Sequence, residues 1–221
     1  MRIIAGRFKG RPILAPPSER TRPILDRAKT VLFDLLGARL AEPGRLPPIA
    51  VLDLFAGTGT LGLEALSRGA RYCRFVEQHH ATARLLIANL ERLGLISEAD
   101  VIKADATTAP LATPPSPPDE PQPSPAGPPP FYELIFVDPP YRMLATPAPA
   151  PGIRMLLTRL AEAPQIAPSA LVVVRHELSR REAPSLAPLV QVHERACGSM
   201  VLRLLVRPDH PDITDGGDDA P

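Results

Sequence analysis

The 221-residue sequence has few cysteines and no long apolar run, and both absences narrow what the protein can be. Cys73 and Cys197 are far apart, have no metal-ligand spacing and lie in apolar stretches, so we expect buried thiols. No apolar stretch reaches the roughly 20 residues that span a bilayer, and we expect no membrane association. The basic N-terminus lacks the long apolar segment of a signal peptide, so the expected compartment is the cytoplasm.

Several catalytic patterns are also missing. The glycine-rich turn at Gly57 has no Lys-Ser or Lys-Thr after it, which excludes a P-loop, and the sequence has no nucleophile elbow. The five histidines show no metal-ligand spacing, so we expect no metal site. They are His79, His80, His176, His193 and His210.

Charge is nearly balanced over the whole chain, at +1, but it is unevenly distributed. Residues 1–30 hold eight Lys or Arg against two acidic residues, whereas the last thirteen residues hold five Asp and no base. A basic segment of this kind suits a polyanionic partner such as RNA. A solvated arm would carry the same charge, so charge alone leaves both interpretations open.

Apolar spacing changes along the chain. Residues 2–14 favour two short strands around a glycine turn, and apolar residues from Ala28 to Leu40 recur at helical spacing, with Asp26 as the N-cap. From residue 50, predicted strands and helices alternate. The predicted strands are 50–55, 71–77, 100–104, 132–138, 170–176, 189–196 and 200–207, and the predicted helices are 60–68, 80–94 and 152–163.

This alternation predicts an α/β fold with a doubly wound, mostly parallel sheet of seven strands. The early strands are nearly continuous apolar runs, as expected where helices cover both faces of a sheet. The last two strands are separated only by Cys197, Gly198 and Ser199, which favours an antiparallel C-terminal hairpin.

Composition also indicates where the parts of the chain begin and end. Residues 1–45 form a basic N-terminal extension of hairpin and helix, and residues 46–207 form the α/β domain. Within that domain, residues 109–130 contain eleven prolines in 22 positions, which favours a flexible insertion over a helix or central strand. A proline-rich docking ligand is the less favoured alternative. Residues 208–221 are acidic, and we expect a disordered tail.

Residues 51–62 read VLDLFAGTGTLG and contain the pattern G-x-G-x-x-G between a strand and a helix. Gly57 and Gly59 permit a sharp turn and close approach of a ligand, which fits NAD, FAD and S-adenosylmethionine alike. Asp53 favours the last of these, because a carboxylate there would repel a pyrophosphate and attract the ammonium and sulfonium groups of S-adenosylmethionine. The alternative is that Asp53 only braces the loop.

Two further acidic residues end the next predicted strands. Glu77 follows Gly59 by eighteen residues, where a carboxylate can accept both ribose hydroxyls of either NAD or S-adenosylmethionine. Asp105 ends the third strand and could accept a hydrogen bond from the adenine amino group. The alternatives are a surface acid at a strand end for Glu77 and a loop cap for Asp105.

The fourth predicted strand runs directly into Asp138-Pro139-Pro140-Tyr141. Two prolines fix a stiff turn that donates no N–H, and we expect carbonyl acceptors beside the Asp138 carboxylate. Acceptors that hold the hydrogens of a planar amino group can turn its lone pair toward a methyl group, while Tyr141 stacks on the base. We therefore predict methylation of an exocyclic nitrogen by positioning and electrostatics. An ordinary proline turn capped by Asp138 is the alternative.

These motifs together resemble the RsmD family, bacterial methyltransferases that modify a guanine N2 in 16S ribosomal RNA. The likeness covers nearly the whole chain except the proline-rich insertion and the acidic tail. The residues that carry it include Arg2-Ile3-Ile4-Ala5-Gly6, Thr21-Arg22-Pro23, Asp26-Arg27, Asp53-Leu54-Phe55-Ala56-Gly57-Thr58-Gly59, Phe75-Val76-Glu77 and Phe136-Val137-Asp138-Pro139-Pro140-Tyr141.

The resemblance implies a class I, Rossmann-like methyltransferase fold and a role for each motif. The cofactor residues would be Asp53, Phe55, Gly57, Gly59, Glu77, Asp105 and Ala106. The residues that hold the target amine would be Asp138, Pro139, Pro140 and Tyr141. The RNA contacts would be Arg7, Lys9, Arg11, Arg22 and Arg27. The expected partner is 16S rRNA, the small ribosomal subunit or its assembly intermediate, and the expected state is a monomer. The chain departs from the family at Ala28, where Val is frequent, and in its long insertion.

Other functions remain open at the level of sequence. The same tetrapeptide permits methylation of adenine N6 in DNA or RNA, or of a protein glutamine, although the basic N-terminal extension disfavours a protein substrate. A nicotinamide-dependent oxidoreductase could use the glycine turn, but it would leave Asp138-Pro139-Pro140-Tyr141 without a role. A non-enzymatic assembly factor is disfavoured by the intact Asp53, Glu77 and Asp138.

Overall fold

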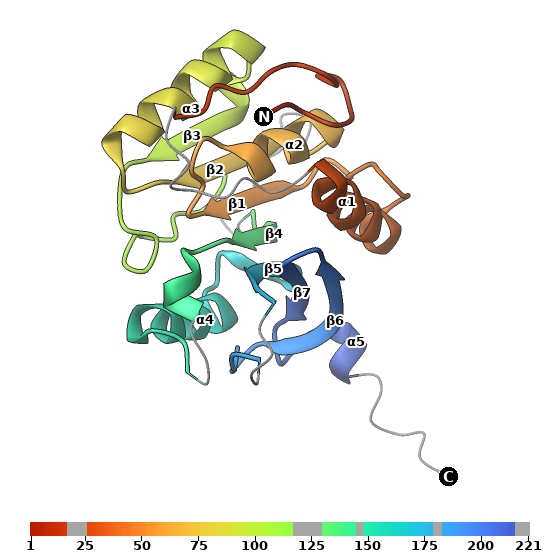
Figure 1. The fold of residues 1–221 in the computed structure, drawn as a ribbon. Coiled ribbons are helices and arrows are strands. Elements are labelled where there is room, and N and C mark those ends of the chain that lie inside the picture. The colour runs from red at the N-terminus through yellow and green to blue at the C-terminus, as the bar shows by residue number, and fades with distance from the viewer. Residues whose placement is uncertain (17–25, 117–129, 145–147, 179–182, 215–221) are drawn as a thin grey trace. The chain divides into compact units, whose positions relative to one another are not determined.

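The computed structural model describes residues 1–16, 26–116, 130–144, 148–178 and 183–214. The chain divides into two compact units, Met1–Ala109 and Pro110–Pro221 (Figure 1). Each unit carries its own strands and helices. In the described residues, no helix has both the length and the apolar character needed to cross a membrane.

The first unit is built on three parallel strands. They are β1 (Ala50–Leu54), β2 (Tyr72–Val76) and β3 (Ala99–Ile102), and the helices are α1 (Asp26–Leu40), α2 (Thr60–Arg68), α3 (His80–Leu93) and the 3-10 turn η1 (Ile96–Glu98). Ala50 pairs with Tyr72 and Cys73 pairs with Ala99, so β2 lies between β1 and β3. All three carboxyl ends therefore meet at one edge of this sheet, and all three amino ends meet at the opposite edge.

The predicted N-terminal hairpin is only partly formed. Arg2 and Pro12 make an isolated antiparallel bridge, and Ile3 exchanges backbone hydrogen bonds with Gly10 and Arg11. No strand is assigned within residues 1–16, so the prediction of two short strands is wrong. The physical reason is that the backbone between these ends bonds to α2 instead of pairing across the hairpin.

Glu64 and Ser67 of α2 supply those bonds. The Glu64 carboxylate accepts the backbone N–H groups of Ile4 and Ala5 at 2.9 and 3.0 Å. Ser67 donates its hydroxyl to the Ala5 carbonyl at 2.6 Å, and its own backbone carbonyl accepts the Arg7 N–H at 2.8 Å. A Cβ on Gly6 would lie 1.8 Å from the Ser67 carbonyl oxygen, so this close approach requires glycine.

The same Glu64 is a fully buried charge with two buried cationic neighbours. Its carboxylate lies 2.9 Å from Arg68 Nε and 3.5 Å from Lys29 Nζ. Lys29 also donates to the Arg2 carbonyl at 2.5 Å, which ties α1 to the N-terminal segment. Burial lowers the Lys29 pKa, and the charge of Glu64 opposes that shift. The N-terminal segment is thus bound to the first unit through a buried ionic cluster.

The second unit contains four strands in a mixed arrangement. They are β4 (Tyr132–Val137), β5 (Ile166–Glu177), β6 (Val190–Cys197) and β7 (Met200–Val206), with the 3-10 turn η2 (Tyr141–Leu144) and helices α4 (Pro151–Glu162) and α5 (Pro211–Thr214). β4 pairs with β5 in parallel, and β7 pairs antiparallel with both β5 and β6. The predicted C-terminal antiparallel hairpin is confirmed, while β5 begins at Ile166, four residues before its predicted start.

Several smaller predictions have mixed outcomes. The prediction of a disordered tail from residue 208 is wrong for the residues of α5. His210, just before this helix, is buried, and its carbonyl accepts the Ile213 N–H. Residues 215–221 and 117–129 lie outside the described residues, and residues 110–116 carry no helix or strand, as the prolines predict. Cys73 is buried as expected, whereas Cys197 is half-buried.

Candidate cofactor and amine sites

The turn after β1 is made of left-handed backbone. Phe55, Gly57 and Gly59 have φ angles of 62°, 59° and 86°. Positive φ is unfavourable for a residue with a side chain, so the backbone of Phe55 is strained. This residue lies in the turn that is predicted to bind the cofactor. A Cβ on Gly59 would lie 2.3 Å from Leu86 Cδ1, whereas nothing lies within 4 Å of a Cβ on Gly57. Gly59 is therefore needed for packing, and Gly57 faces open space.

Asp53 is buried at the carboxyl end of β1 and braces the start of α2. Its Oδ2 accepts the backbone N–H of Gly62 at 2.9 Å, one of the N–H groups that a helix start leaves without a partner. This is the bracing role that the sequence left as an alternative. It does not exclude a cationic ligand, because a carboxylate has further lone pairs and keeps its negative charge.

Glu77 links two loops at the same edge. Its Oε2 accepts the Gly57 N–H at 2.9 Å, and its Oε1 accepts the His79 N–H at 2.7 Å. The side chain is largely buried just after β2, as the spacing predicts. Each carboxylate oxygen still has a lone pair that could accept a hydroxyl, and the two backbone bonds fix where those lone pairs point.

Asp105 and Ala106 follow β3 at this edge. Asp105 Oδ1 accepts both the N–H and the hydroxyl of Thr107 at 2.8 Å, so the side chain forms a local loop cap. The Asp105 residue is exposed and Ala106 is buried. The first unit therefore brings the predicted cofactor residues Asp53, Glu77 and Asp105 to the ends of three adjacent parallel strands.

The second unit holds Asp138 in an ion pair that the sequence did not predict. Arg175 of β5 donates Nε–H to Asp138 Oδ1 at 2.6 Å, and both side chains are mostly buried. Burial raises the Asp138 pKa, and the charge and hydrogen bond of Arg175 oppose that shift. Arg175 therefore favours the ionised carboxylate, which accepts hydrogen bonds, over the protonated acid.

The rest of the tetrapeptide surrounds this pair. The Arg175 guanidinium carbon lies 5.9 Å from the centroid of the Tyr141 ring. The Pro140 carbonyl accepts the Met143 N–H at 2.8 Å and so closes η2, which occupies one of its two lone pairs and makes it less available to a substrate. Pro139 is buried directly before it. Asp138 and the Pro139 carbonyl remain as the candidate acceptors, and Pro140 shapes the turn.

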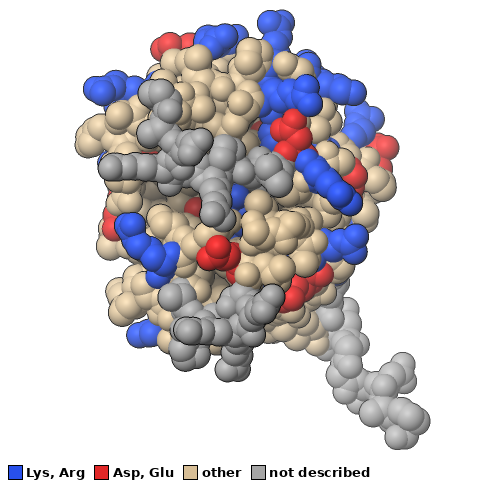
Figure 2. Space-filling view, in the orientation of Figure 1, with Lys and Arg blue, Asp and Glu red and all other residues tan. Residues whose placement is uncertain are grey.

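The predicted RNA contacts are distributed unevenly. Arg7 is ion-paired with Glu98, while Lys9, Arg11 and Arg27 are exposed, and Arg22 lies outside the described residues. Figure 2 shows Lys and Arg side chains gathered over the part of the first unit where Figure 1 draws the N-terminal segment and α1. Exposed Lys and Arg side chains gathered on one surface suit contact with a polyanion.

Known proteins resemble this chain over most of its length. The family model described as "Conserved hypothetical protein 95" matches residues 1–206. The Haemophilus influenzae protein named ribosomal RNA small subunit methyltransferase D is 33% identical over 190 residues, which are 85% of this chain and 83% of that protein. YlbH of Bacillus subtilis, whose name assigns it provisionally to the rRNA methyltransferases, is 31% identical over 90% of this chain and 94% of its own.

Solved structures give the same result for the fold. The Escherichia coli protein yhhF has a TM-score of 0.69 and 28% identity, covering 94% of this chain and 97% of its own. The rRNA methyltransferase aviRa of Streptomyces viridochromogenes shares the fold at 18% identity, with a TM-score of 0.60 and 91% coverage of each chain. These likenesses confirm the predicted fold class, a Rossmann-like class I methyltransferase fold.

Proposed function

The chain belongs to the RsmD family, whose model is described as "Conserved hypothetical protein 95", and from this membership we propose that it methylates 16S rRNA on a guanine N2 with S-adenosylmethionine as methyl donor. The observation that carries the proposal is the placement of Asp138 directly after β4, in an ion pair with Arg175 and next to a fixed proline turn. This arrangement provides a charged acceptor where a planar amine would need one.

The residues of the first unit fit the proposed methyl donor. Asp53 and Glu77 place two carboxylates at the ends of neighbouring strands, and carboxylates suit a ligand that carries ammonium and sulfonium groups. Asp53 would hold the amino acid end, Glu77 the ribose and Asp105 the adenine, with Gly57 leaving room for close approach. When bound, S-adenosylmethionine supplies an electrophilic methyl group.

The chain's own residues act on the amine by orienting it. One Asp138 oxygen is engaged by Arg175, so the other is the one that can accept an amine hydrogen. The Pro139 carbonyl is the second acceptor, and Tyr141 provides a ring for stacking against the base. Holding both hydrogens turns the nitrogen lone pair away from the conjugated ring, which makes the nitrogen a better nucleophile.

Two observations favour RNA as the substrate over the alternatives. The exposed cations of the N-terminal segment suit a polyanion, which disfavours a protein glutamine. The name of the Haemophilus influenzae relative refers to ribosomal RNA of the small subunit. The guanine N2 position rests on the family resemblance, and adenine N6 is the main competing target because Asp138-Pro139-Pro140-Tyr141 would hold either amine.

Transfer of a labelled methyl group tests this proposal directly. The protein is incubated with radiolabelled S-adenosylmethionine and with undermethylated 30S subunits, naked 16S rRNA or DNA, and the label is mapped by nucleoside analysis. We expect label on N2-methylguanosine from 16S rRNA. Label on adenine, on DNA or on protein would overturn the assignment.

Variants of the ion pair test how the amine is held. Asp138→Ala should abolish transfer while calorimetry shows unchanged cofactor binding, since Asp138 is assigned to the amine alone. Arg175→Met should lower kcat by about 10- to 100-fold, because hydrogen bonds to charged groups contribute about 1.5–3 kcal/mol. Arg175→Lys should restore part of that loss by keeping the charge. Loss of cofactor binding in Asp138→Ala would show that the assignment of Asp138 is wrong.

A further inference from the structure

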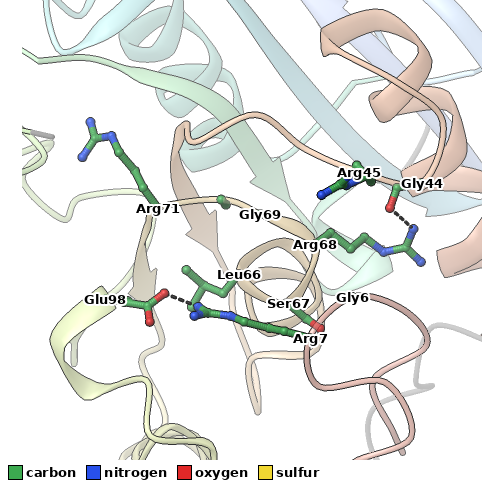
Figure 3. Close-up of a pocket in the computed structure, with 11 residues that line it drawn as sticks. Gly6, Arg7, Gly44, Arg45, Leu66, Ser67, Arg68, Gly69, Arg71 and Glu98 are labelled. Carbon is green, nitrogen blue, oxygen red and sulfur yellow. Dashed lines mark hydrogen bonds and ion pairs between the residues drawn. The ribbon is translucent and has the colours of Figure 1, made fainter. Parts of the chain in front are cut away.

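The amino-end edge of β1–β3 contains a pocket that the proposed reaction does not use. Its volume is about 560 Å³, and its walls come from the N-terminal segment, the loop before β1, the end of α2 and the residues before β2 and β3 (Figure 3). A five-residue strand such as β1 is roughly 15 Å long, so this edge is well separated from the turn that holds Gly57 and Gly59.

Arginines dominate the charge of this pocket. Four of them line it, and Glu98 is the one acidic residue among the lining side chains. They are Arg7, Arg45, Arg68 and Arg71. Figure 3 shows that they come from four different segments of the chain, with Gly6, Gly44 and Gly69 between them. Because those three positions carry no side chain, guanidinium groups and backbone form much of the wall.

The four arginines are not equivalent. Arg68 is buried, bonds to Glu64 and donates to the Gly44 carbonyl at 3.1 Å, so it holds the wall in place. Arg7 is held across the pocket by its ion pair with Glu98. The Arg45 side chain is 74% exposed, and its 3.5 Å contact with Glu42, which is also exposed, is of a kind that contributes little to stability. Arg45 can therefore turn to a ligand with little loss.

We propose that this pocket binds backbone phosphodiester groups of the RNA substrate. The inference rests on the proposed function, which makes RNA the substrate, and it assigns the amino-end edge a part in holding that RNA. A guanidinium group matches a phosphate with two parallel hydrogen bonds, and several guanidiniums around one pocket suit a chain of phosphates better than a single anion. Contacts of this kind fix the register of the RNA and carry no base specificity.

The pocket also joins two features that sequence analysis treated separately. Arg7 was expected to contact RNA as part of the N-terminal extension, and the structure places it beside Arg45, Arg68 and Arg71, which were not expected to do so. The buried bonds from Glu64 and Ser67 hold the N-terminal segment against α2. The phosphate site is thus built between the extension and the core of the first unit.

The salt dependence of RNA binding tests the proposal. We would measure the Kd for naked 16S rRNA, and separately for 30S subunits, between about 50 and 200 mM salt, using wild type, Arg45→Glu and the double variant R45A/R71A. Each lost phosphate contact should make the slope of log K against log salt shallower by about 0.7–0.9. The expected increase in Kd is about tenfold for Arg45→Glu at 100 mM salt. Arg195→Glu, which changes the charge of an exposed β6 arginine outside the pocket by the same −2 as either pocket variant, is the charge-matched control.

Each outcome decides one of the two proposals. Shallower slopes for the pocket variants but not for Arg195→Glu, with unchanged calorimetric binding of S-adenosylmethionine, support the pocket. A slope equal to that of the control overturns it, even when wild type methylates 16S rRNA. A change seen with 30S subunits but not with naked RNA also overturns it, in favour of a ribosomal protein contact.

A shallower slope together with no methyl transfer by wild type would leave the pocket in place and refute the proposed function. Should R45A/R71A fail to fold, Arg45→Glu alone decides, because its side chain is on the surface.

Discussion

The two edges of the parallel strands in the first unit carry opposite charges. Asp53 lies at the carboxyl end of β1, and Glu77 and Asp105 follow the carboxyl ends of β2 and β3, whereas arginines line the pocket at the amino ends. The acidic edge uses its carboxylates to accept backbone N–H groups of its own turns. The charge of the basic edge is only partly offset, by one buried carboxylate, Glu64, and one more exposed carboxylate, Glu98. A single small sheet can thus present a surface suited to a cationic cofactor and another suited to a polyanion.

The largest effect should come from removing the buried carboxylate of the basic edge. Glu64→Ala leaves Lys29 and Arg68 as buried charges without their anion, and removes the acceptors for Ile4 and Ala5. Breaking a buried ion pair in this way destabilises by about 3–5 kcal/mol, which denaturant unfolding would measure. Glu91→Ala, an exposed acid of α3, should change stability by less than about 0.5 kcal/mol. Equal stability of the two variants would show that the buried ionic cluster around Glu64 does not stabilise the first unit.

A pair of glycine variants should separate packing from ligand access at the acidic edge. Gly59→Ala combines positive φ with a contact of 2.3 Å to buried Leu86, and should lower stability by about 2–3 kcal/mol. Gly57→Ala has only the strain of positive φ, about 1 kcal/mol, but its methyl group enters the open space of the turn. We expect Gly57→Ala to weaken S-adenosylmethionine binding at least tenfold by calorimetry. Unchanged binding would place the cofactor away from this turn.

Asp53→Asn should distinguish charge from bracing. The amide oxygen can still accept the Gly62 N–H, so the melting temperature should change by only a few degrees. Loss of the negative charge should raise the Kd for S-adenosylmethionine by about 10- to 100-fold, which corresponds to about 1.4–2.8 kcal/mol. An unchanged Kd would show that Asp53 only braces α2.

The smallest effect should come from Glu98, the half-buried acid of the basic edge. Glu98→Gln removes the anion that holds Arg7, so it should strengthen RNA binding by about two- to threefold at low salt. The increase should disappear at high salt because screening weakens all such contacts. Glu91→Gln removes an equal charge outside the pocket and should have a smaller effect. Weaker RNA binding in Glu98→Gln would mean that Arg7 needs Glu98 to be positioned.

Local pattern was enough to locate the acidic edge. The bounds of α2, Thr60–Arg68, agree with the predicted helix because glycines stand on both sides of it. Asp53 and Glu77 were found because each lies at the end of an apolar strand, four residues before Gly57 for Asp53 and eighteen residues after Gly59 for Glu77. The same local signals placed Asp138 at the end of β4.

The basic edge and the partner of Asp138 have no such local signal. Arg175 is 37 residues from Asp138, near the end of a mostly apolar strand, and only strand pairing brings the two side chains together. Glu64 and Lys29 appeared as ordinary polar positions of two helices, because their mutual contact depends on how α1 and α2 pack. The N-terminal strands were predicted wrongly for the same reason, since α2 supplies the hydrogen bonds that a hairpin would otherwise make.

Glu77 has a consequence for the thermodynamics of ligand binding. Because its carboxylate accepts the backbone N–H groups of both Gly57 and His79, Glu77 ties the loops after β1 and β2 to each other within the protein's own fold. Ordering one residue of backbone opposes binding by about 1–2 kcal/mol, and here that entropy is lost during folding instead. The cofactor should therefore meet a rigid receptor, with a heat of binding that reflects contacts made and water released rather than loop closure.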